Sequence, residues 1–234
     1  MSKKPHKVLG ILGGMGPAAT AEFLRLLAEM AGAEKDQDHP RIVLFSNPQI
    51  PDRTAAITGG GEDPAPLLLE GLKTLQSWGA QLLAVPCNTA HVFINRFRDR
   101  LSVPLVHIVE ETISRAMRTS PGGAWLTATS GTSSSRIYET EAKKRDYPLL
   151  IPGPETQNML EEVIALVKAN RLSESAARLE SCLRILWSEK DIPVIGACTE
   201  LPLAYRSSAM DQEKIISSLD SLALACLERI YSPS

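Results

Sequence analysis

Residues 82–89 read LLAVPCNT and predict a buried strand that ends just before a cysteine. Residues 194–200 read VIGACTE and have the same order: an apolar run, a cysteine and a threonine. Unbroken apolar runs are typical of parallel strands that helices cover on both faces. The two stretches therefore predict an α/β fold in which two strands each lead to a cysteine, Cys87 and Cys198.

The rest of the chain alternates short apolar runs with longer helical patterns, which is typical of βα units that build a parallel sheet. Further strands are expected at residues 8–12, 42–45, 105–108, 124–127 and 149–151. Helices are expected at residues 155–169 and 173–189, with a last helix at about 212–231.

The chain also divides into two similar halves. Each begins with a strand and a glycine-containing turn, LGILGGMGP at residues 9–17 and WLTATSGT at residues 125–132. Each then reaches its cysteine after a similar length of chain. We expect two similar α/β domains that face each other across a cleft, the first formed by residues 1–112 plus 212–234 and the second by residues 113–211.

Composition narrows the class of partner. The chain has 234 residues, is 44% hydrophobic and carries a formal net charge of -2, which argues against general attraction to nucleic acid or to anionic membranes. No apolar run approaches the length of a membrane span, and residues 1–7 do not resemble a secretory signal. The four cysteines form no CxxC pair. We therefore expect a cytoplasmic protein with reduced thiols and a small-molecule partner.

The two strand-end cysteines are the candidate catalytic groups. Ligands of open α/β sheets bind beyond the carboxyl ends of the strands, where Cys87 and Cys198 are expected. A helix that begins there would lower the thiol pKa and favour the reactive thiolate. Cys182 and Cys226 lie among leucines in helical patterns and are expected to serve packing alone.

Two thiols on opposite sides of one carbon suit a specific reaction. One can remove a proton while the other returns a proton to the opposite face, which inverts the centre. The carbanion that forms needs preorganised hydrogen-bond donors. The candidate donors near the strand ends are Asn88, Thr89, Thr129, Ser130, Thr132 and Thr199.

Four motifs in order resemble the aspartate/glutamate racemase family, and within it the aspartate racemases. They are GGMGP at residues 13–17, NPQIPDR at 47–53, PCNTAH at 86–91 and CTEL at 198–201. The resemblance implies two flavodoxin-like domains with parallel sheets, related by pseudo-two-fold symmetry, with the active site in the cleft between them.

The same resemblance implies a mechanism. Cys87 and Cys198 would catalyse racemisation without pyridoxal phosphate or metal, commonly in a homodimer. Arg53 and Lys168 would hold the side-chain carboxylate of the substrate. Arg53 also has support from its chemistry, because a guanidinium binds a carboxylate bidentately. Met15, Gln49 and Glu200, which lie in the same motifs, complete the expected substrate-binding set.

Two positions depart from the family pattern. Trp125 stands where a glycine is common, which raises the question of how the domain junction and the cleft are packed. Ala197 stands where a glycine often precedes the second cysteine, a small change that should leave the thiol in place.

Other functions fit parts of the sequence. Residues 14–19 formally match a dinucleotide-binding turn, but strand 42–45 lacks the acidic residue that would bind a ribose. His91 lies four residues after Cys87, as in a Cys/His hydrolase or acyl transferase, but Cys198 would then have no role. A decarboxylase or isomerase on the same scaffold, and a small-acid binding protein, remain open.

The sequence thus predicts an isomerase that interconverts L- and D-aspartate. Glutamate, or a broader set of amino acids, is the alternative within the same mechanism, because one methylene is worth only about 1–3 kcal/mol of discrimination in a pocket.

Overall fold

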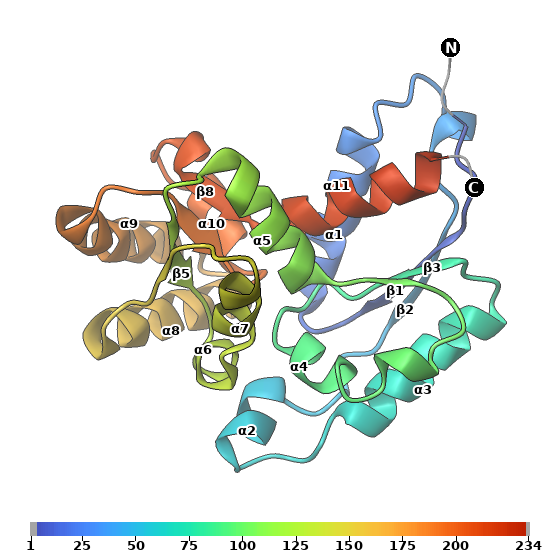
Figure 1. Cartoon of the computed structure of the whole chain (residues 1–234), viewed down its shortest axis with the longest axis horizontal. Coiled ribbons are helices and arrows are strands. Elements are labelled where there is room, and N and C mark those ends of the chain that lie inside the picture. Colours follow the sequence, from blue (N-terminus) through green and yellow to red (C-terminus); the bar gives the residue numbers. More distant parts are fainter. Residues whose placement is uncertain (1–3, 233–234) are drawn as a thin grey trace.

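Two parallel four-stranded sheets form the framework of the protein (Figure 1). The structure, a computed structural model, describes residues 4–232. Sheet A has the strand order β2-β1-β3-β4 and sheet B the order β6-β5-β7-β8. The strands are β1 (Leu9–Gly13), β2 (Ile42–Ser46), β3 (Leu82–Ala84), β4 (Leu105–Val106), β5 (Ala124–Thr127), β6 (Leu149–Leu150), β7 (Val194–Gly196) and β8 (Ile215–Ser217). The predicted α/β class with parallel sheets is confirmed.

The helices connect and cover these strands. They are α1 (Pro17–Met30), α2 (Arg53–Thr58), α3 (Ala65–Ser77), α4 (Ala90–Ile94), α5 (Ile108–Thr119), α6 (Ser130–Ser135), α7 (Ile137–Lys144), α8 (Pro154–Lys168), α9 (Leu172–Glu189), α10 (Leu201–Arg206) and α11 (Ser218–Tyr231). Short 3₁₀ turns lie at Asp36–Asp38, Arg98–Arg100 and Gln212–Lys214. The two helices predicted from hydrophobic periodicity, α8 and α9, begin and end within one residue of their expected bounds.

The two sheets repeat one topology, because the second order is the first with every strand number raised by four. In sheet A, β1 pairs with β2 on one side and with β3 on the other. In sheet B, β5 pairs in the same way with β6 and β7. The strands that lead to the two cysteines, β3 and β7, therefore occupy equivalent central positions.

Strand β8 was not expected from the sequence. It has three residues, two of them apolar, within a polar segment, and it hydrogen-bonds to β7 in sheet B. The chain then returns through α11, which packs against α1 and α5. The sequence analysis placed all residues from 212 onward in the first half, whereas β8 is a strand of sheet B. Residues 1–3 and 233–234 of the predicted first domain lie outside the described part of the chain.

One hydrophobic core joins the two halves. Its buried side chains come from both sheets and from α1, α5, α7 and α11, for example Ile11 of β1, Leu126 of β5 and Leu222 of α11. Each fully buried leucine or isoleucine contributes roughly 1.5–3 kcal/mol relative to an exposed one. Separate clusters lie on the outer faces, under α3 and α4 on sheet A and under α8, α9 and α10 on sheet B. Since the inner core is shared, it fixes the position of one half against the other.

Trp125 belongs to the outer core of sheet B. It packs in a cluster with Leu160 of α8 and Leu183 of α9, and its side chain is 5% exposed. Its indole Nε1 donates a 3.0 Å hydrogen bond to the carbonyl oxygen of Lys190. The large ring that departs from the family pattern thus fills the space between sheet B and its covering helices.

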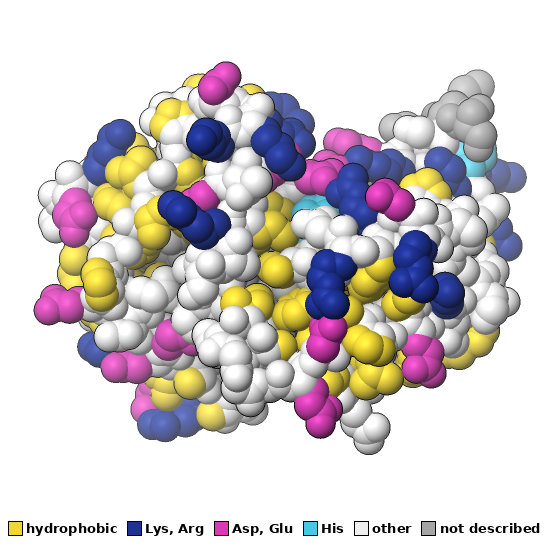
Figure 2. All heavy atoms as spheres, turned by 60° about the horizontal axis from the view of Figure 1, so that its bottom comes forward, with side chains coloured by type: hydrophobic (Ala, Val, Ile, Leu, Met, Phe, Trp, Pro, Cys, Tyr) yellow, Lys and Arg dark blue, Asp and Glu magenta, His cyan; other side chains and the backbone are white. Residues whose placement is uncertain are grey.

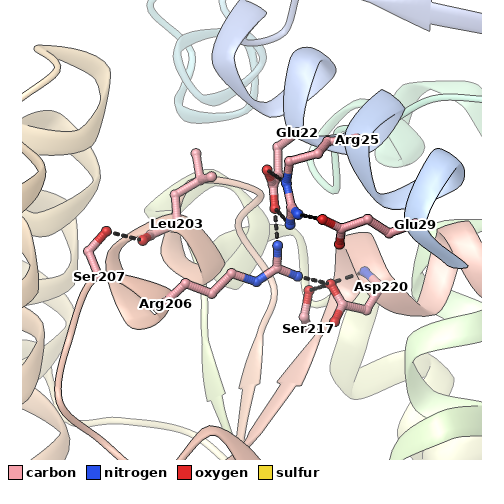
Figure 3. A network of polar contacts seen from close by, with 8 residues as sticks. All are labelled: Glu22, Arg25, Glu29, Leu203, Arg206, Ser207, Ser217 and Asp220. Carbon is pink, nitrogen blue, oxygen red and sulfur yellow. Dashed lines mark hydrogen bonds and ion pairs between the residues drawn. The ribbon is translucent and has the colours of Figure 1, made fainter.

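An ion-pair network also links the halves (Figure 3). Arg206 at the end of α10 pairs with Glu22 of α1 and lies 2.7 Å from Oδ1 of Asp220 in the first turn of α11. Glu22 in turn accepts two hydrogen bonds from Arg25, 2.7 and 2.8 Å long. The helix that follows Cys198 is in this way tied to the helix that follows the glycine-rich turn of β1.

The surface has mixed charge. Figure 2 shows lysine and arginine side chains interspersed with aspartate and glutamate over one face, in keeping with the small net charge of -2. Among residues 4–232, no helix is both long and apolar enough to cross a membrane.

Candidate active site

A pocket between the halves contains both strand-end cysteines. Its empty volume, open mouth included, is about 350 Å³. Its lining residues are Met15, Asp52, Arg53, Thr54, Cys87, Asn88, Thr89, Thr129, Lys168, Cys198, Thr199 and Glu200. All but Lys168, which ends α8, come from loops and helix starts that follow strands of both sheets, where open α/β sheets bind ligands.

The sheet topology places the two thiols there. Cys87 comes three residues after the last residue of β3, and Cys198 comes two residues after the end of β7. The cysteines are only 6% and 5% exposed. Each half therefore supplies one buried thiol to the shared pocket.

The groups around Cys87 have opposite effects on the pKa of its thiol. Burial raises the pKa of its thiol, while the Arg53 guanidinium and a hydrogen bond from the backbone N–H of Ala90 lower it, and the net pKa lies above the usual value. Ala90 is the first residue of α4, so the expected contact with a helix N-terminus is present. The expected lowered pKa is wrong, because removing a thiolate from water costs more than these contacts return.

Cys198 has an acidic neighbour instead. Its Sγ lies 3.1 Å from Oε2 of Glu200, which also accepts a 3.1 Å hydrogen bond from the Thr199 hydroxyl. Burial raises the pKa of the Cys198 thiol well above its usual value, and the Glu200 carboxylate raises it further. The expected lowered pKa is wrong here too, for the added reason that a carboxylate repels a thiolate.

Helix α2 carries the predicted arginine to the pocket. The Asp52 carboxylate accepts a 2.8 Å hydrogen bond from the N–H of Ala55 and so caps the helix. Arg53 donates from Nη1 to the carbonyl oxygens of Ile50 and Pro51, both at 3.1 Å, which fixes the direction of the side chain. Its Nε is buried and has no hydrogen-bond partner in the structure. Arg53 therefore retains donors that an anionic ligand could use.

Close packing between α2 and α6 covers one side of the pocket. A Cβ atom on Gly131 of α6 would lie 2.7 Å from Oγ1 and 2.8 Å from Cα of Thr54. Because such distances are too short for real Cβ atoms, this approach of the two halves requires glycine. Thr54 itself lines the pocket.

Three threonine hydroxyls join the halves at the pocket wall. Oγ1 of Thr89 lies 2.8 Å from Oγ1 of Thr132 and 3.2 Å from that of Thr129. The Thr129 hydroxyl also accepts a 3.1 Å hydrogen bond from the N–H of Thr132, which caps α6. The threonines predicted as substrate ligands thus form one hydroxyl cluster, of which Thr89 and Thr129 line the pocket.

The Asn88 side chain has protein partners at both ends. Its Oδ1 accepts a 2.6 Å hydrogen bond from the Tyr138 hydroxyl, and its Nδ2 donates a 3.0 Å bond to Oγ of Ser218. Asn88 lines the pocket as expected, but its amide chiefly anchors the Cys87 loop. No sequence pattern near Asn88 indicates these two partners, which are distant along the chain.

The remaining predicted residues divide into two groups. Met15, Thr199, Glu200 and Lys168 line the pocket, Lys168 as the last residue of α8. Gln49, Ser130 and Thr132 do not. Gln49 is exposed, the N–H of Ser130 donates to Glu161, and Thr132 is the fully buried member of the hydroxyl cluster.

Two pocket residues were missed by the sequence analysis. Asp52 and Thr54 flank Arg53 and line the pocket with it. Their position next to Arg53 could have indicated that they reach the pocket. The sequence alone does not show in which direction each side chain points at a turn that starts a helix.

His91 is bound to the backbone on both sides. Its Nδ1 lies 2.8 Å from the carbonyl oxygen of Cys87, and the N–H of Ile108 points to its Nε2 at 3.5 Å. Burial, and then the neighbouring His107, hold the pKa of His91 well below the usual range, so the ring is neutral. A ring engaged in this way is not placed to activate the Cys87 thiol, which argues against the hydrolase interpretation.

The glycine-rich turn after β1 serves packing within the protein. Gly14 has a φ of 94°, and a Cβ on it would lie 2.5 to 2.7 Å from the backbone of Asn47. A Cβ on Gly13 would lie 2.4 Å from the side chain of Thr20. The close approaches that require glycine are thus made by the chain itself, which weakens the dinucleotide interpretation.

The Asp/Glu/Hydantoin racemase model matches residues 12–226, almost the whole chain and both cysteines. The chain belongs to the Asp/Glu/hydantoin racemase family. The expectation drawn from the four motifs is confirmed at the level of the family. Within residues 4–232, no group of three or more His, Cys, Asp and Glu side chains is arranged to hold a metal ion.

Relatives of this racemase differ in the activity that their names give. A broad-specificity amino-acid racemase, RacX of Bacillus subtilis, is 29% identical over 200 residues, which cover 83% of this chain and 86% of the relative. The structure of aspartate racemase from Picrophilus torridus is 30% identical, with a TM-score of 0.84 over 96% of this chain and 94% of that one. Proteins whose names give different substrates are therefore similar to this racemase, one in sequence and one in structure.

Glutamate racemases share the fold as well. Isoform RacE1 from Bacillus anthracis is 20% identical, with a TM-score of 0.67 over 95% of this chain and 80% of that one. The similarity confirms the predicted pair of flavodoxin-like domains in this racemase.

Proposed function

We propose that this racemase interconverts L- and D-aspartate, with Cys87 and Cys198 as its two acid/base groups and without pyridoxal phosphate or metal. One observation carries the proposal: the two halves contribute one buried cysteine each to the same pocket. Cys182 and Cys226 are also buried, but they lie in hydrophobic clusters and do not line the pocket.

The reaction needs one thiolate and one thiol. The thiolate removes the α-hydrogen of the bound amino acid, and the thiol on the other side of the α-carbon gives its proton to the carbanion. The product has the opposite configuration, and the proton has in effect moved from one sulfur to the other. The reverse reaction uses the same two groups with their roles exchanged.

The pocket wall supplies the stabilisation that a carbanion requires. Thr89 and Thr129 line it, and their hydroxyl cluster can supply a donor to the α-carboxylate, whose negative charge grows as the proton leaves. The thiols are at most 6% exposed, so water is largely excluded from the reacting atoms. A buried thiolate of raised pKa is also a stronger base, which suits the weak acidity of the α-hydrogen.

The preference for aspartate rests on two cations of the pocket. Arg53 and Lys168 come from opposite halves and both line it, so together they can hold a second carboxylate. The relative from Picrophilus torridus is named an aspartate racemase. A broader specificity is the second candidate, favoured by the name of the Bacillus subtilis relative and by the exposure of Lys168, which leaves its ammonium free to turn toward water.

The test is incubation of metal-free, pyridoxal-free protein with L-aspartate in deuterated water, followed by chiral separation and mass analysis. D-aspartate that carries deuterium at the α-carbon is the expected product. The same assay with glutamate, alanine and other amino acids separates narrow from broad specificity. Absence of exchange with every amino acid would contradict racemisation and favour the binding-protein interpretation.

Matched cysteine variants test the roles. Cys87→Ser and Cys198→Ser should each lower turnover by at least about a thousandfold, since an alcohol is a far weaker acid than a thiol. Cys182→Ser changes a buried cysteine outside the pocket and should retain turnover. Normal racemisation by the Cys198 variant would contradict the two-base mechanism.

The proposal includes a homodimer in a reducing cytoplasm. All four cysteines are free and buried, which fits a reducing compartment. Light scattering after size-exclusion chromatography measures the assembly, and a single-chain mass would contradict the dimer.

A further inference from the structure

Glu200 differs from the other acidic residue of the pocket in what it touches. Asp52 turns to the N–H of Ala55 and caps α2. Glu200 stands at the start of α10 but makes no such cap; its carboxylate turns to the Cys198 thiol and the Thr199 hydroxyl instead. The side chain is 5% exposed. A buried carboxylate thus accepts a hydrogen bond from one of the two sulfurs of the pocket.

The glycine-rich turn of the other half lies beside this carboxylate. A Cβ atom on Gly16 would lie 3.4 Å from Oε1 of Glu200, so the turn after β1 packs closely beside the carboxylate. Oε2 accepts from both Cys198 and Thr199. The two hydrogen bonds on Oε2 hold the carboxylate toward the thiol.

Cys87 has a neighbour of the opposite sign. The Arg53 guanidinium lines the pocket with Cys87 and lowers the pKa of that thiol, against the effect of burial. The nearest charged partner of one cysteine is therefore a cation, and that of the other is an anion. The two cysteines follow equivalent strands but differ in the sign of the charge beside the sulfur.

We propose that Glu200 is a positioning residue that keeps the single exchangeable proton on Cys198, so that Cys87 is the first thiol to ionise. The geometry carries this step. A thiol can donate to a carboxylate at 3.1 Å, whereas a thiolate at that distance would meet a like charge in a buried site. The inference deepens the proposed racemase mechanism and rests on it for its catalytic meaning.

Other charges around the sulfurs do not reverse this order. Lys168 lowers the pKa of Cys198, but its side chain is exposed and its effect is smaller than that of burial or of Glu200. Glu200 also raises the pKa of Cys87, though less than Arg53 lowers it. The asymmetry between the two thiols therefore depends chiefly on Glu200 and Arg53.

In the free enzyme, the form in which Cys87 is the thiolate is therefore favoured over the form in which Cys198 is the thiolate. The enantiomer whose α-hydrogen faces Cys87 meets the ready base, and turnover leaves the proton on Cys87. The other enantiomer requires the enzyme in which Cys198 is the thiolate, a form of higher free energy but a stronger base. Overall equilibrium between the enantiomers is unaffected.

The opposite role for Glu200 is a base that takes the proton from Cys198 and so activates it. The two roles predict opposite effects of one isosteric change. If Glu200 holds the proton on sulfur, Glu200→Gln removes the like charge and makes Cys198 easier to ionise. If Glu200 is the activating base, the same substitution makes Cys198 harder to ionise.

The experiment is alkylation of the intact protein with iodoacetamide from pH 7 to 11, with peptide mass spectrometry to follow each cysteine separately. A midpoint above this range is obtained from the reaction rates below it, which are proportional to the thiolate fraction. In the wild-type protein, the midpoint of Cys87 should lie at the lower pH. In Glu200→Gln, the midpoint of Cys198 should fall by about one pH unit or more, while that of Cys87 falls less.

Asp52→Asn is the matched control. It also removes one negative charge from the pocket wall, and asparagine still caps a helix, so the Cys198 midpoint should stay unchanged. Arg53→Gln provides the complementary change and should raise the midpoint of Cys87.

A Cys198 midpoint that stays or rises in Glu200→Gln would overturn the inference. So would a wild-type protein in which Cys198 ionises first, a result that needs no variant to fold. Alkylation does not depend on turnover. An inactive protein with the expected midpoints would therefore refute the proposed function alone, and an active one with reversed midpoints would refute this inference alone.

Discussion

The hydroxyl of Tyr138 donates a 2.6 Å hydrogen bond to Oδ1 of Asn88, the residue that follows Cys87. Tyr138 lies on α7 in the second half and is fully buried. Burial raises the pKa of its hydroxyl, which therefore remains a neutral donor. Since Ser218 binds the other end of the same amide, the loop that carries the Cys87 thiol is fixed by residues outside its own sheet.

Tyr138→Phe should loosen this loop. The change leaves a buried amide oxygen without its donor, which costs about 1–3 kcal/mol of unfolding free energy. We also expect racemisation to slow by roughly tenfold, because a misplaced thiol raises the barrier. Urea unfolding and steady-state kinetics measure the two effects. Tyr205→Phe is the control: its hydroxyl donates to Asp211 away from the pocket, so stability should fall while turnover stays.

Gly131→Ala should disturb the closure of the pocket. The new methyl group would overlap Thr54, so α2 or α6 must shift, and overpacking of this kind costs about 1–3 kcal/mol. We expect kcat/KM to fall because α2 also carries Arg53. Gly122→Ala, at a position with open space around it, should leave the kinetics unchanged. Equal activity of the two variants would show that the contact between α2 and α6 does not affect the pocket.

Lys168→Met tests the second cation. If its ammonium holds the side-chain carboxylate, KM for aspartate should rise by about tenfold or more, while KM for alanine stays nearly constant. Lys143→Met removes another exposed lysine from the last turn of a helix, away from the pocket, and should change neither value. A parallel rise for both substrates would indicate a role in packing instead.

His107 should make the protein less stable in acid. Burial, with the nearby Arg98 and Lys144, lowers its pKa from 6.5 to about 4, so between these values the unfolded chain binds a proton that the folded protein does not. Stability is therefore complete above pH 6.5 and falls as the pH drops to 4, by up to about 3 kcal/mol for this group.

His107→Asn isolates that contribution. The ring Nδ1 accepts from the N–H of Glu110 and caps α5, and asparagine can replace this cap without titrating. Urea unfolding at pH 7, 5.5 and 4.5 should show a shallower loss of stability in the variant. The slope will not vanish, because His91 has a lowered pKa as well. An unchanged slope would assign the acid sensitivity to other groups.

Much of the fold could be predicted because its signals are local. Strands such as 82–85 are unbroken apolar runs, and α8 and α9 show helical periodicity that continues for several turns. Strand β8 could not be predicted, since three residues carry too little periodicity to be distinguished from a loop. Its pairing with β7 depends on contacts with a strand about twenty residues earlier in the chain.

The sequence by itself determined the α/β class, the two-fold repetition, and the position of Cys87 and Cys198 at strand ends. These follow from hydrophobic patterns and from the rule that parallel sheets place the ends of their strands together. Only the tertiary structure decided the electrostatics of the two thiols. Helix starts indicate a lowered pKa, but burial outweighs that effect at both thiols; Glu200 raises the pKa of Cys198 further, whereas Arg53 lowers that of Cys87. Burial and charge contacts are set by segments that meet only in the folded chain, and this is why the sequence could name the candidate catalytic residues but not their ionisation.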